Sequence, residues 1–416
     1  MYRLTNLTRV AAVGALAVLA GCESKRSLLG PTVPAGGDMF KSYVAIGNSI
    51  TAGFQSNGIN DSTQRQSYAR LLAGQMGTQY HYASLAGRGC TPPIANTQTG
   101  ALVGTGSTSS TCDLRAASSV TDILNNVAVP GARVLDPTSS STVASNALTT
   151  FILGGMTQVQ RALQAEPTFA TIWIGNNDVL VAGLSGVLVP VGAPFNLNGI
   201  ISTQAQFQTS YDAMISQLTA GAPGLKGVLI GVAQVANLPS LSSGGLIAAT
   251  PTIQAGISAA AGKPVTIHPD CIGSTSLINV PQIIAGIRAN NPAIPPIIVC
   301  KPGEPGFPFP VGDLYVLDAT EQATLSGVIN GYNTYIKNKA DAIGFAYYDP
   351  NILFAAKRAS GEIPPFPNLA SPTATFGTLI SLDGVHPSGA AHLLIANEII
   401  SVINAKYATS LKPAVQ

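Results

Sequence analysis

Residues 43–53 have the sequence YVAIGNSITAG, and this stretch decides the fold expected for the chain. Its first four residues are apolar or aromatic, which predicts a short buried strand. The strand runs into Gly47, Asn48 and Ser49, residue types that favour a tight turn. A serine placed here presents its hydroxyl at the carboxyl edge of a sheet, where open α/β folds bind their ligands. Ser49 is therefore the first candidate functional residue.

Strand-like and helical patterns alternate along the rest of the chain. Short strands are expected at 79–83, 169–174, 227–232 and 345–348. Stretches with apolar residues at helical spacing lie at 66–76, 144–165, 204–218, 320–342 and 388–406. With right-handed crossovers, this alternation predicts an α/β fold, a flavodoxin-like three-layer α/β/α sandwich with a mainly parallel sheet.

Three stretches show little periodicity and are expected to be loop insertions in one domain that spans residues 39–416. Residues 91–143 are rich in Ser, Thr and Gly, residues 237–313 are rich in Pro and Gly, and residues 357–377 resemble a surface loop. Loops of this length in a compact domain are usually functional or disordered. A cysteine pair in or next to each of the first two favours order.

The first residues resemble a bacterial lipoprotein signal. Arg3 and Arg9 precede an apolar run that is too short to span a bilayer and that ends at Cys22. In such a signal, residues 1–21 are removed and the cysteine is acylated; the alternative is a signal peptide with an incidental cysteine. Residues 22–38 then form a flexible tether. The expected location is the bacterial cell envelope, at the outer membrane, on its periplasmic or surface face.

The remaining cysteines fit an exported protein. Cys90, Cys112, Cys271 and Cys300 are an even number, and four cysteines allow three disulfide connectivities. Proximity in the sequence favours Cys90 with Cys112 and Cys271 with Cys300. Four buried free thiols are the alternative.

Charge and motif content argue against several partners. Once Arg3 and Arg9 leave with the signal, 19 of the 21 Lys and Arg residues balance 19 acidic residues, and a neutral chain without a basic run is a poor candidate for nucleic acid. The cysteines form no Cys-x-x-Cys pair and the four histidines are scattered, so no metal site is expected. No phosphate-binding loop occurs, and no cofactor is implied.

A second motif near the C-terminus supplies a carboxylate and an imidazole, in the run Asp383-Gly384-Val385-His386-Pro387. A serine hydroxyl is a poor nucleophile until a base removes its proton. An imidazole is a suitable base because it ordinarily titrates near neutrality. Ser49, His386 and Asp383 are therefore the parts of an activated nucleophile, with the carboxylate orienting the ring.

Two further segments offer hydrogen-bond donors for a developing oxyanion. The strand expected at 169–174 runs into Gly175-Asn176-Asn177-Asp178, so Asn177 can present its amide near Ser49, unless it only caps its own loop. After the strand expected at 79–83, Gly87 can point a backbone N–H into the same space, with Gly89 as the alternative.

In this order, the serine, glycine, asparagine and Asp/His blocks resemble the SGNH, or GDSL-like, hydrolase superfamily. The resemblance implies that Ser49 is the nucleophile, His386 the base, Asp383 its partner, and that Gly87, Asn177 and the Ser49 N–H bind the oxyanion. Asn48 stands where the family name has aspartate.

The resemblance implies a serine hydrolase that cleaves carboxylic esters through an acyl-enzyme. The apolar segments 179–197 and 238–257 are expected to line a cleft for an acyl chain, which favours a lipid or short-chain ester as substrate. One alternative is removal of acetyl groups from carbohydrate. Another is a non-catalytic envelope lipoprotein that acts as a binding module. The oligomeric state is left open.

Overall fold

The computed structural model describes residues 37–104, 123–139, 148–188, 201–301 and 314–415. Its main sheet contains parallel strands in the order β1 (Tyr43–Gly47), β2 (Phe169–Trp173), β3 (Lys226–Ile230) and β9 (Ala346–Tyr348). Cys22, Cys112, the predicted signal and all but the last two residues of the predicted tether lie outside the described residues.

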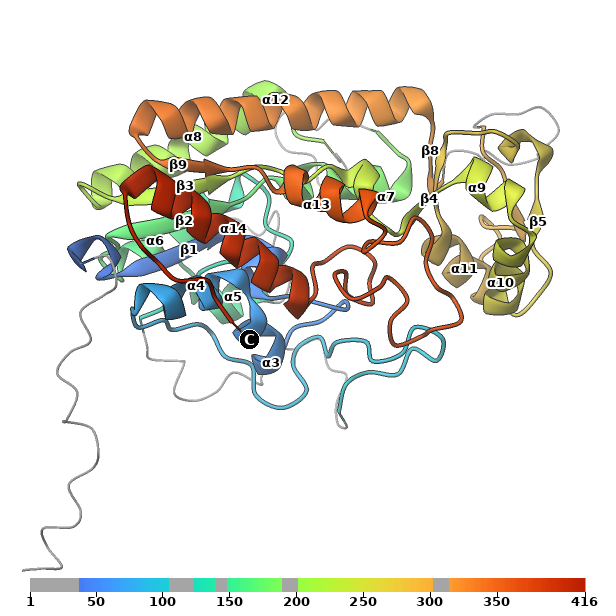
Figure 1. Cartoon of the computed structure of the whole chain (residues 1–416), viewed down its shortest axis with the longest axis horizontal. Coiled ribbons are helices and arrows are strands. Elements are labelled where there is room, and N and C mark those ends of the chain that lie inside the picture. Colours follow the sequence, from blue (N-terminus) through green and yellow to red (C-terminus); the bar gives the residue numbers. More distant parts are fainter. Residues whose placement is uncertain (1–36, 105–122, 140–147, 189–200, 302–313, 416) are drawn as a thin grey trace, which may run out of the picture.

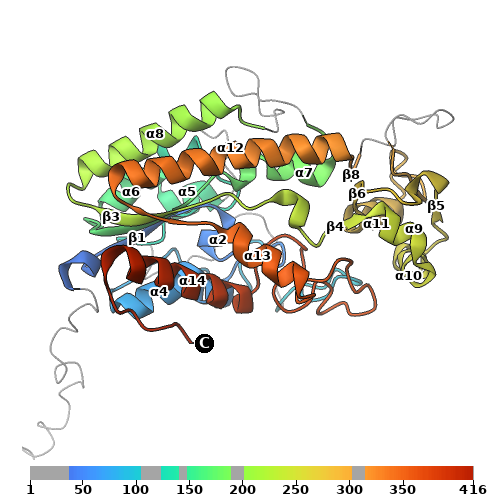
Figure 2. The same cartoon turned by 45° about the horizontal axis from the view of Figure 1, so that its top comes forward.

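Helices cover both faces of this sheet, as Figures 1 and 2 show. One layer contains α8 (Gln204–Gly221) and the long α12 (Ala319–Ile343), and the other contains α4 (Tyr68–Met76) and α14 (Gly389–Tyr407). The predicted three-layer α/β sandwich with a mainly parallel sheet is therefore confirmed.

Alternate residues along each strand explain why both layers pack. In β1, Val44 and Ile46 belong to the core under α8 and α12, whereas Tyr43 and Ala45 belong to the core under α4 and α14. Because successive side chains of a strand point to opposite faces, a strand buried on both faces must be continuously apolar. Trp173 of β2 is fully buried, as its place in an apolar strand predicts.

The edge of the sheet beside β1 differs from the prediction. Residues 79–83 form no regular strand, and only Tyr82 makes a bridge, to Asn126. The neighbour of β1 is instead residues 125–129: the Val127 N–H donates to the Ala45 carbonyl at 3.0 Å, and the Val129 N–H donates to the Gly47 carbonyl at 3.1 Å. This segment lies within the stretch that was expected to be an insertion. Its pairing with β1 is short and irregular, so the sequence of this segment shows no periodic pattern.

The remaining helices of the sandwich are short. They are η1 (Gly37–Phe40), α2 (Ser49–Ala52), α3 (Asp61–Gln66), η3 (Asp136–Thr138), α5 (Leu148–Leu153), α6 (Gln158–Leu163), η5 (Asn176–Asp178), α7 (Leu180–Ser185), η6 (Val235–Asn237) and α13 (Pro350–Ala359). The prediction of a single helix over residues 144–165 is wrong for the part of this range that the structure describes. Gly154 and Gly155 have φ values of 61° and 88°, and this left-handed backbone ends α5 before α6 begins.

The stretch 237–313 is not the irregular loop that was expected. It holds α9 (Gly244–Ala249), α10 (Pro251–Ala261), η7 (Pro269–Cys271) and α11 (Val280–Arg288). An antiparallel sheet joins β4 (Leu241–Ser243), β6 (Leu277–Asn279) and β8 (Val316–Leu317), and β5 (Thr266–Ile267) pairs with β7 (Ile297–Ile298). Prolines that look like loop signals lie in the first turns of α10 and α11, where no intrahelical N–H is needed.

This insertion packs around a hydrophobic cluster of its own beside the sandwich, at the right of Figure 1. Within the described residues, no helix combines the length and apolar character of a membrane span.

Candidate active site

Ser49 is the first residue of α2, directly after β1, as the strand-to-turn pattern predicts. Asn48 caps the short helix, and its Oδ1 accepts a hydrogen bond from the Ile50 N–H at 3.2 Å. Ser49 is 7% exposed and lines a cleft.

The serine meets the loop that carries the second motif. The Ser49 hydroxyl lies 2.8 Å from His386 Nε2, and His386 Nδ1 lies 2.8 Å from Asp383 Oδ2. The ring centroids of Phe54 and His386 are 5.0 Å apart, so an aromatic side chain packs against the imidazole. The structure therefore brings together the three side chains that the sequence singled out, although 337 residues separate the serine from the histidine.

Asp383 is held as a carboxylate. Burial raises the pKa of this carboxyl, but the nearby His386 charge, the hydrogen bond with His386 Nδ1, and the His386 and Asn57 backbone N–H groups outweigh burial and lower it to about 2. The Val385 N–H also donates to Asp383 Oδ1, at 2.9 Å. A carboxylate ionised at all ordinary pH values can fix the tautomer and orientation of the ring.

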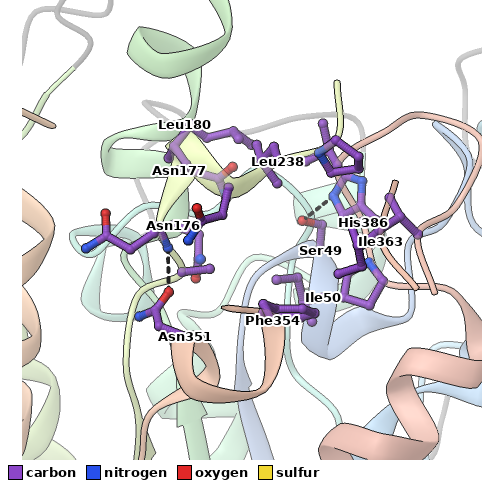
Figure 3. A pocket seen from close by; sticks show the side chains of 18 residues that line it. Ser49, Ile50, Asn176, Asn177, Leu180, Leu238, Asn351, Phe354, Ile363 and His386 are labelled. Carbon is purple, nitrogen blue, oxygen red and sulfur yellow. Dashed lines mark hydrogen bonds between the residues drawn. The ribbon is translucent and has the colours of Figure 1, made fainter. Parts of the chain in front are cut away.

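Asn177 lies across the opening from Ser49 in Figure 3. It belongs to η5, at the carboxyl end of β2, and its side chain lines the cleft. Its Nδ2 donates to the Ala132 carbonyl at 2.8 Å. An amide NH2 carries two hydrogens, so this bond fixes the amide and leaves a second hydrogen for a ligand.

Gly87 does not take the predicted place. It follows residues 79–83, which form no strand beside β1. The reason is topological: residues 125–129, and not residues 79–83, pair with β1. The chain that leaves this position contains Gly131, which has a φ of 83° and directly precedes Ala132, the residue held by Asn177. A short apolar run ending in Pro130-Gly131 was the available signal, inside a stretch that looked aperiodic.

The cleft is lined by two unlike groups of side chains, which meet where Leu180 lies beside Asn177 in Figure 3 and which we call the apolar wall and the amide wall. One is apolar and is formed by Leu180, Val235, Leu238, Phe354, Ile363 and Ile380. The other presents side-chain amides, from Asn176, Asn177, Gln234, Asn237 and Asn351. Leu180 and Leu238 come from the two apolar segments that were expected to line a cleft. In Figure 3, Ile50 and Phe354 lie below Ser49, so the apolar wall begins at the serine.

One buried and one partly buried carboxyl group support this side of the site. Asp178 is fully buried and accepts hydrogen bonds from the Ser202 hydroxyl and, at 2.9 Å, from the Val134 N–H. Burial raises its pKa to about 6, and burial together with the Asp178 charge raises the pKa of Asp136 to about 7. Asp178 therefore ties η5, which carries Asn177, to the segment that carries Gly131.

Of the two predicted disulfides, the one whose cysteines both lie in the described residues is present. Cys271 and Cys300 are bonded, with Cα atoms 5.0 Å apart, as predicted. Asp270 lies beside them, but the two sulfurs are bonded to each other and do not offer a pair of thiolates to a metal. Cys112 lies outside the described residues, so its pairing with Cys90 stays a prediction, as does the acylation of Cys22.

Comparisons with known proteins agree with this geometry. The family model described as GDSL-like Lipase/Acylhydrolase matches residues 43–399. A comparison with curated proteins finds no match.

Solved structures that resemble the chain have low identity. An acetylxylan esterase from Geobacillus stearothermophilus is 11% identical with a TM-score of 0.37, covering 87% of this chain and 94% of its own. A Clostridium thermocellum family 3 carbohydrate esterase is 15% identical with a TM-score of 0.34, covering 88% and 97%. An extracellular lipase from Streptomyces rimosus is 15% identical with a TM-score of 0.32, covering 88% and 99%. We draw no substrate assignment from them. The family match, which spans the sheet, the serine turn and the Asp383–His386 loop, shows that the chain belongs to the GDSL-like lipase/acylhydrolase family of carboxylic ester hydrolases.

Proposed function

We propose that the protein hydrolyses esters of apolar acyl chains through an acyl-enzyme on Ser49. The observation that carries this proposal is the hydrogen-bonded series from Ser49 through His386 to Asp383, which opens directly onto the apolar wall of the cleft.

The reaction begins when Ser49 Oγ attacks the ester carbonyl carbon and its proton passes to His386 Nε2. In this proposal, the Asn177 amide and the Ser49 N–H bind the charge that develops on the carbonyl oxygen. The Gly131 N–H is the third donor that we propose, because Gly131 directly precedes Ala132, whose carbonyl holds Asn177. The tetrahedral intermediate collapses, and the alcohol leaves with the proton from His386. Water then attacks the acyl-enzyme, gives a proton to His386, and releases the carboxylic acid while Ser49 regains its proton.

In this proposal, the two halves of the substrate lie against different walls of the cleft. The acyl chain lies against Leu180, Leu238, Phe354 and their neighbours, since each methylene buried there contributes about 0.8 kcal/mol. The alcohol lies toward the amide wall. That wall supports a second candidate, removal of acetyl groups from carbohydrate, because amides can hydrogen-bond sugar hydroxyls. A non-catalytic binding module has no need of the complete series of three side chains.

A chain-length series separates these candidates. We expect kcat/KM for aryl esters to rise from acetate to octanoate and to exceed that for an acetylated xylo-oligosaccharide, because longer chains bury more apolar surface. Ser49→Ala is the control and should abolish turnover and labelling by a fluorophosphonate. A preference for the acetylated sugar, with rates that fall as the acyl chain lengthens, favours the deacetylase. Labelling that persists in Ser49→Ala contradicts the assignment of the nucleophile.

We further propose that the chain is exported and anchored by a lipid on Cys22 at the bacterial cell envelope. The support is the sequence pattern of residues 1–22, together with a disulfide in the insertion, which fits an oxidising compartment.

A further inference from the structure

A tight turn that follows the serine helix lies against the loop that carries Asp383. The turn spans residues 55–58, and Gln55 and Gly58 exchange backbone hydrogen bonds of 2.8 and 3.0 Å. Its two central residues, Ser56 and Asn57, have φ values of 54° and 60°. Two consecutive positive φ angles define a type I′ turn, a geometry that glycine and asparagine favour and serine does not.

The turn makes three hydrogen bonds to the other loop. The Ser56 N–H donates to Ser381 Oγ at 2.9 Å, and Ser56 Oγ accepts from the Leu382 N–H at 3.1 Å. The Asn57 N–H donates to Asp383 Oδ2 at 2.9 Å. The two loops are more than 320 residues apart in the chain, so these bonds form only in the folded protein.

Ser381 completes the contact with the carboxylate. Its hydroxyl donates to Asp383 Oδ1 at 3.1 Å, while the oxygen of the same hydroxyl accepts from Ser56. Asp383 Oδ2, which faces His386 Nδ1, also receives the Asn57 N–H. Each carboxylate oxygen is therefore held by a group outside the Asp383–His386 run, in addition to the donors within it.

We propose that Ser56, Asn57 and Ser381 form an acid clamp, a set of positioning residues that hold Asp383 and, through it, aim His386 at Ser49. Since residues in rare backbone regions persist only when their surroundings enforce them, the conformation of this turn indicates a constraint that the site requires. The clamp is attached three residues after α2 ends. It therefore fixes the acid and base relative to the nucleophile despite their distance in sequence.

The hydroxyl part of the clamp is tested with Ser381→Ala, Ser381→Thr and a matched control, Ser243→Ala, which removes a serine cap from α9 in the insertion. We expect kcat and the rate of fluorophosphonate labelling of Ser49 to fall about tenfold in Ser381→Ala with KM unchanged, because a hydrogen bond to a charged group is lost. Ser381→Thr keeps the hydroxyl and should restore most of the rate. Ser243→Ala should lower the melting temperature but leave the labelling rate unchanged.

The backbone part is tested with Asn57→Val and Asn57→Gly. A β-branched residue is strongly disfavoured at a φ of about 60°, so valine should displace the N–H from Asp383 and slow labelling about tenfold or more. Glycine accepts this φ and keeps the N–H, and should retain the native rate. Asn290→Val imposes the same strain on a residue with a φ of 52° in the insertion and controls for loss of stability.

The outcomes separate this proposal from the proposed function, on which it rests. Native protein that does not label at Ser49 overturns the proposed function and the clamp with it. Native protein that labels, together with Ser381→Ala and Asn57→Val variants that label at the native rate, overturns only the clamp. The clamp alone is also overturned if Ser243→Ala and Asn290→Val lose the rate as strongly, or if Ser381→Thr and Asn57→Gly do not restore it.

Discussion

Asn48 shows how one departure from the family pattern fits its neighbours. Its Oδ1 accepts the Ile50 N–H, and its Nδ2 donates to Asn176 Oδ1 at 3.3 Å. An aspartate can make the first bond but has no hydrogen for the second. The asparagine therefore links the serine turn to the amide wall of the cleft, where Asn176 lies next to Asn177.

The oxyanion donor is the residue assignment most open to test. We expect Gly131→Ala to lower kcat by at least tenfold with little change in KM, because a Cβ strains a φ of 83° and moves the N–H that we propose as an oxyanion donor. Gly87→Ala is the matched control: Gly87 has a φ of 62°, is also exposed, and a Cβ there meets no atom within 4 Å. Steady-state kinetics on an aryl ester checks both variants. A loss confined to Gly87→Ala would return the donor to the position first expected from the sequence.

At the scale of elements, one carboxyl group on η3 and one on η5 make stability depend on pH. Asp136 of η3 and Asp178 of η5 have pKa values raised to about 7 and about 6. In the unfolded chain, both carboxyls lose their protons near pH 4. Between these pH values the folded state binds more protons, so the free energy of unfolding falls as pH rises. The stabilisation is fully present below about pH 4 and is lost by about pH 7.

Asp136→Asn should remove much of this fall. The amide resembles the protonated carboxyl, so we expect the variant to be more stable than the native protein at pH 8 by on the order of 2 kcal/mol, and to differ little at pH 4. Urea unfolding at intervals from pH 4 to 8 measures the difference. Asp341→Asn, at an exposed carboxylate paired with Lys337, is the control and should not change the slope. An unchanged slope in Asp136→Asn contradicts the raised pKa.

At the scale of the whole molecule, the cleft lies where the insertion leaves the sandwich. Leu238 lines the cleft and β4 begins at Leu241, while the Ser240 N–H donates to the Gly384 carbonyl at 3.3 Å, on the loop of His386. Asn279 of β6 donates to the Leu184 carbonyl of α7, 2.9 Å away. The insertion therefore braces two elements that line the site, and its disulfide stabilises that support.

Anchoring should be separable from catalysis. Every residue assigned to the reaction lies between Ser49 and His386, so we expect Cys22→Ser to keep native kcat/KM on a soluble aryl ester while losing partition into detergent and labelling by a fatty-acid probe. Phase partitioning of the exported protein and metabolic labelling measure this. A Cys22→Ser variant that still takes up the lipid label contradicts the anchor.

The sequence by itself determined the fold class and the reacting side chains. The strands that became β1, β2, β3 and β9 are mostly apolar because nearly all of their residues are buried, and that pattern is visible without coordinates. Short local patterns also identified the reacting residues. Ser49 stands in a turn after a strand, and Asp383 and His386 place a carboxylate and an imidazole on one loop.

Only the tertiary structure decided which segment pairs with β1. Residues 79–83 and 125–129 are both short, and hydrogen bonds to β1, not composition, select the second. The same holds for Ser381, Ser56 and Asn57, whose roles come from bonds across more than 320 residues. Backbone N–H groups provide several of these hydrogen bonds. Because every residue except proline carries such a group, the sequence alone does not show which of them takes part in a site.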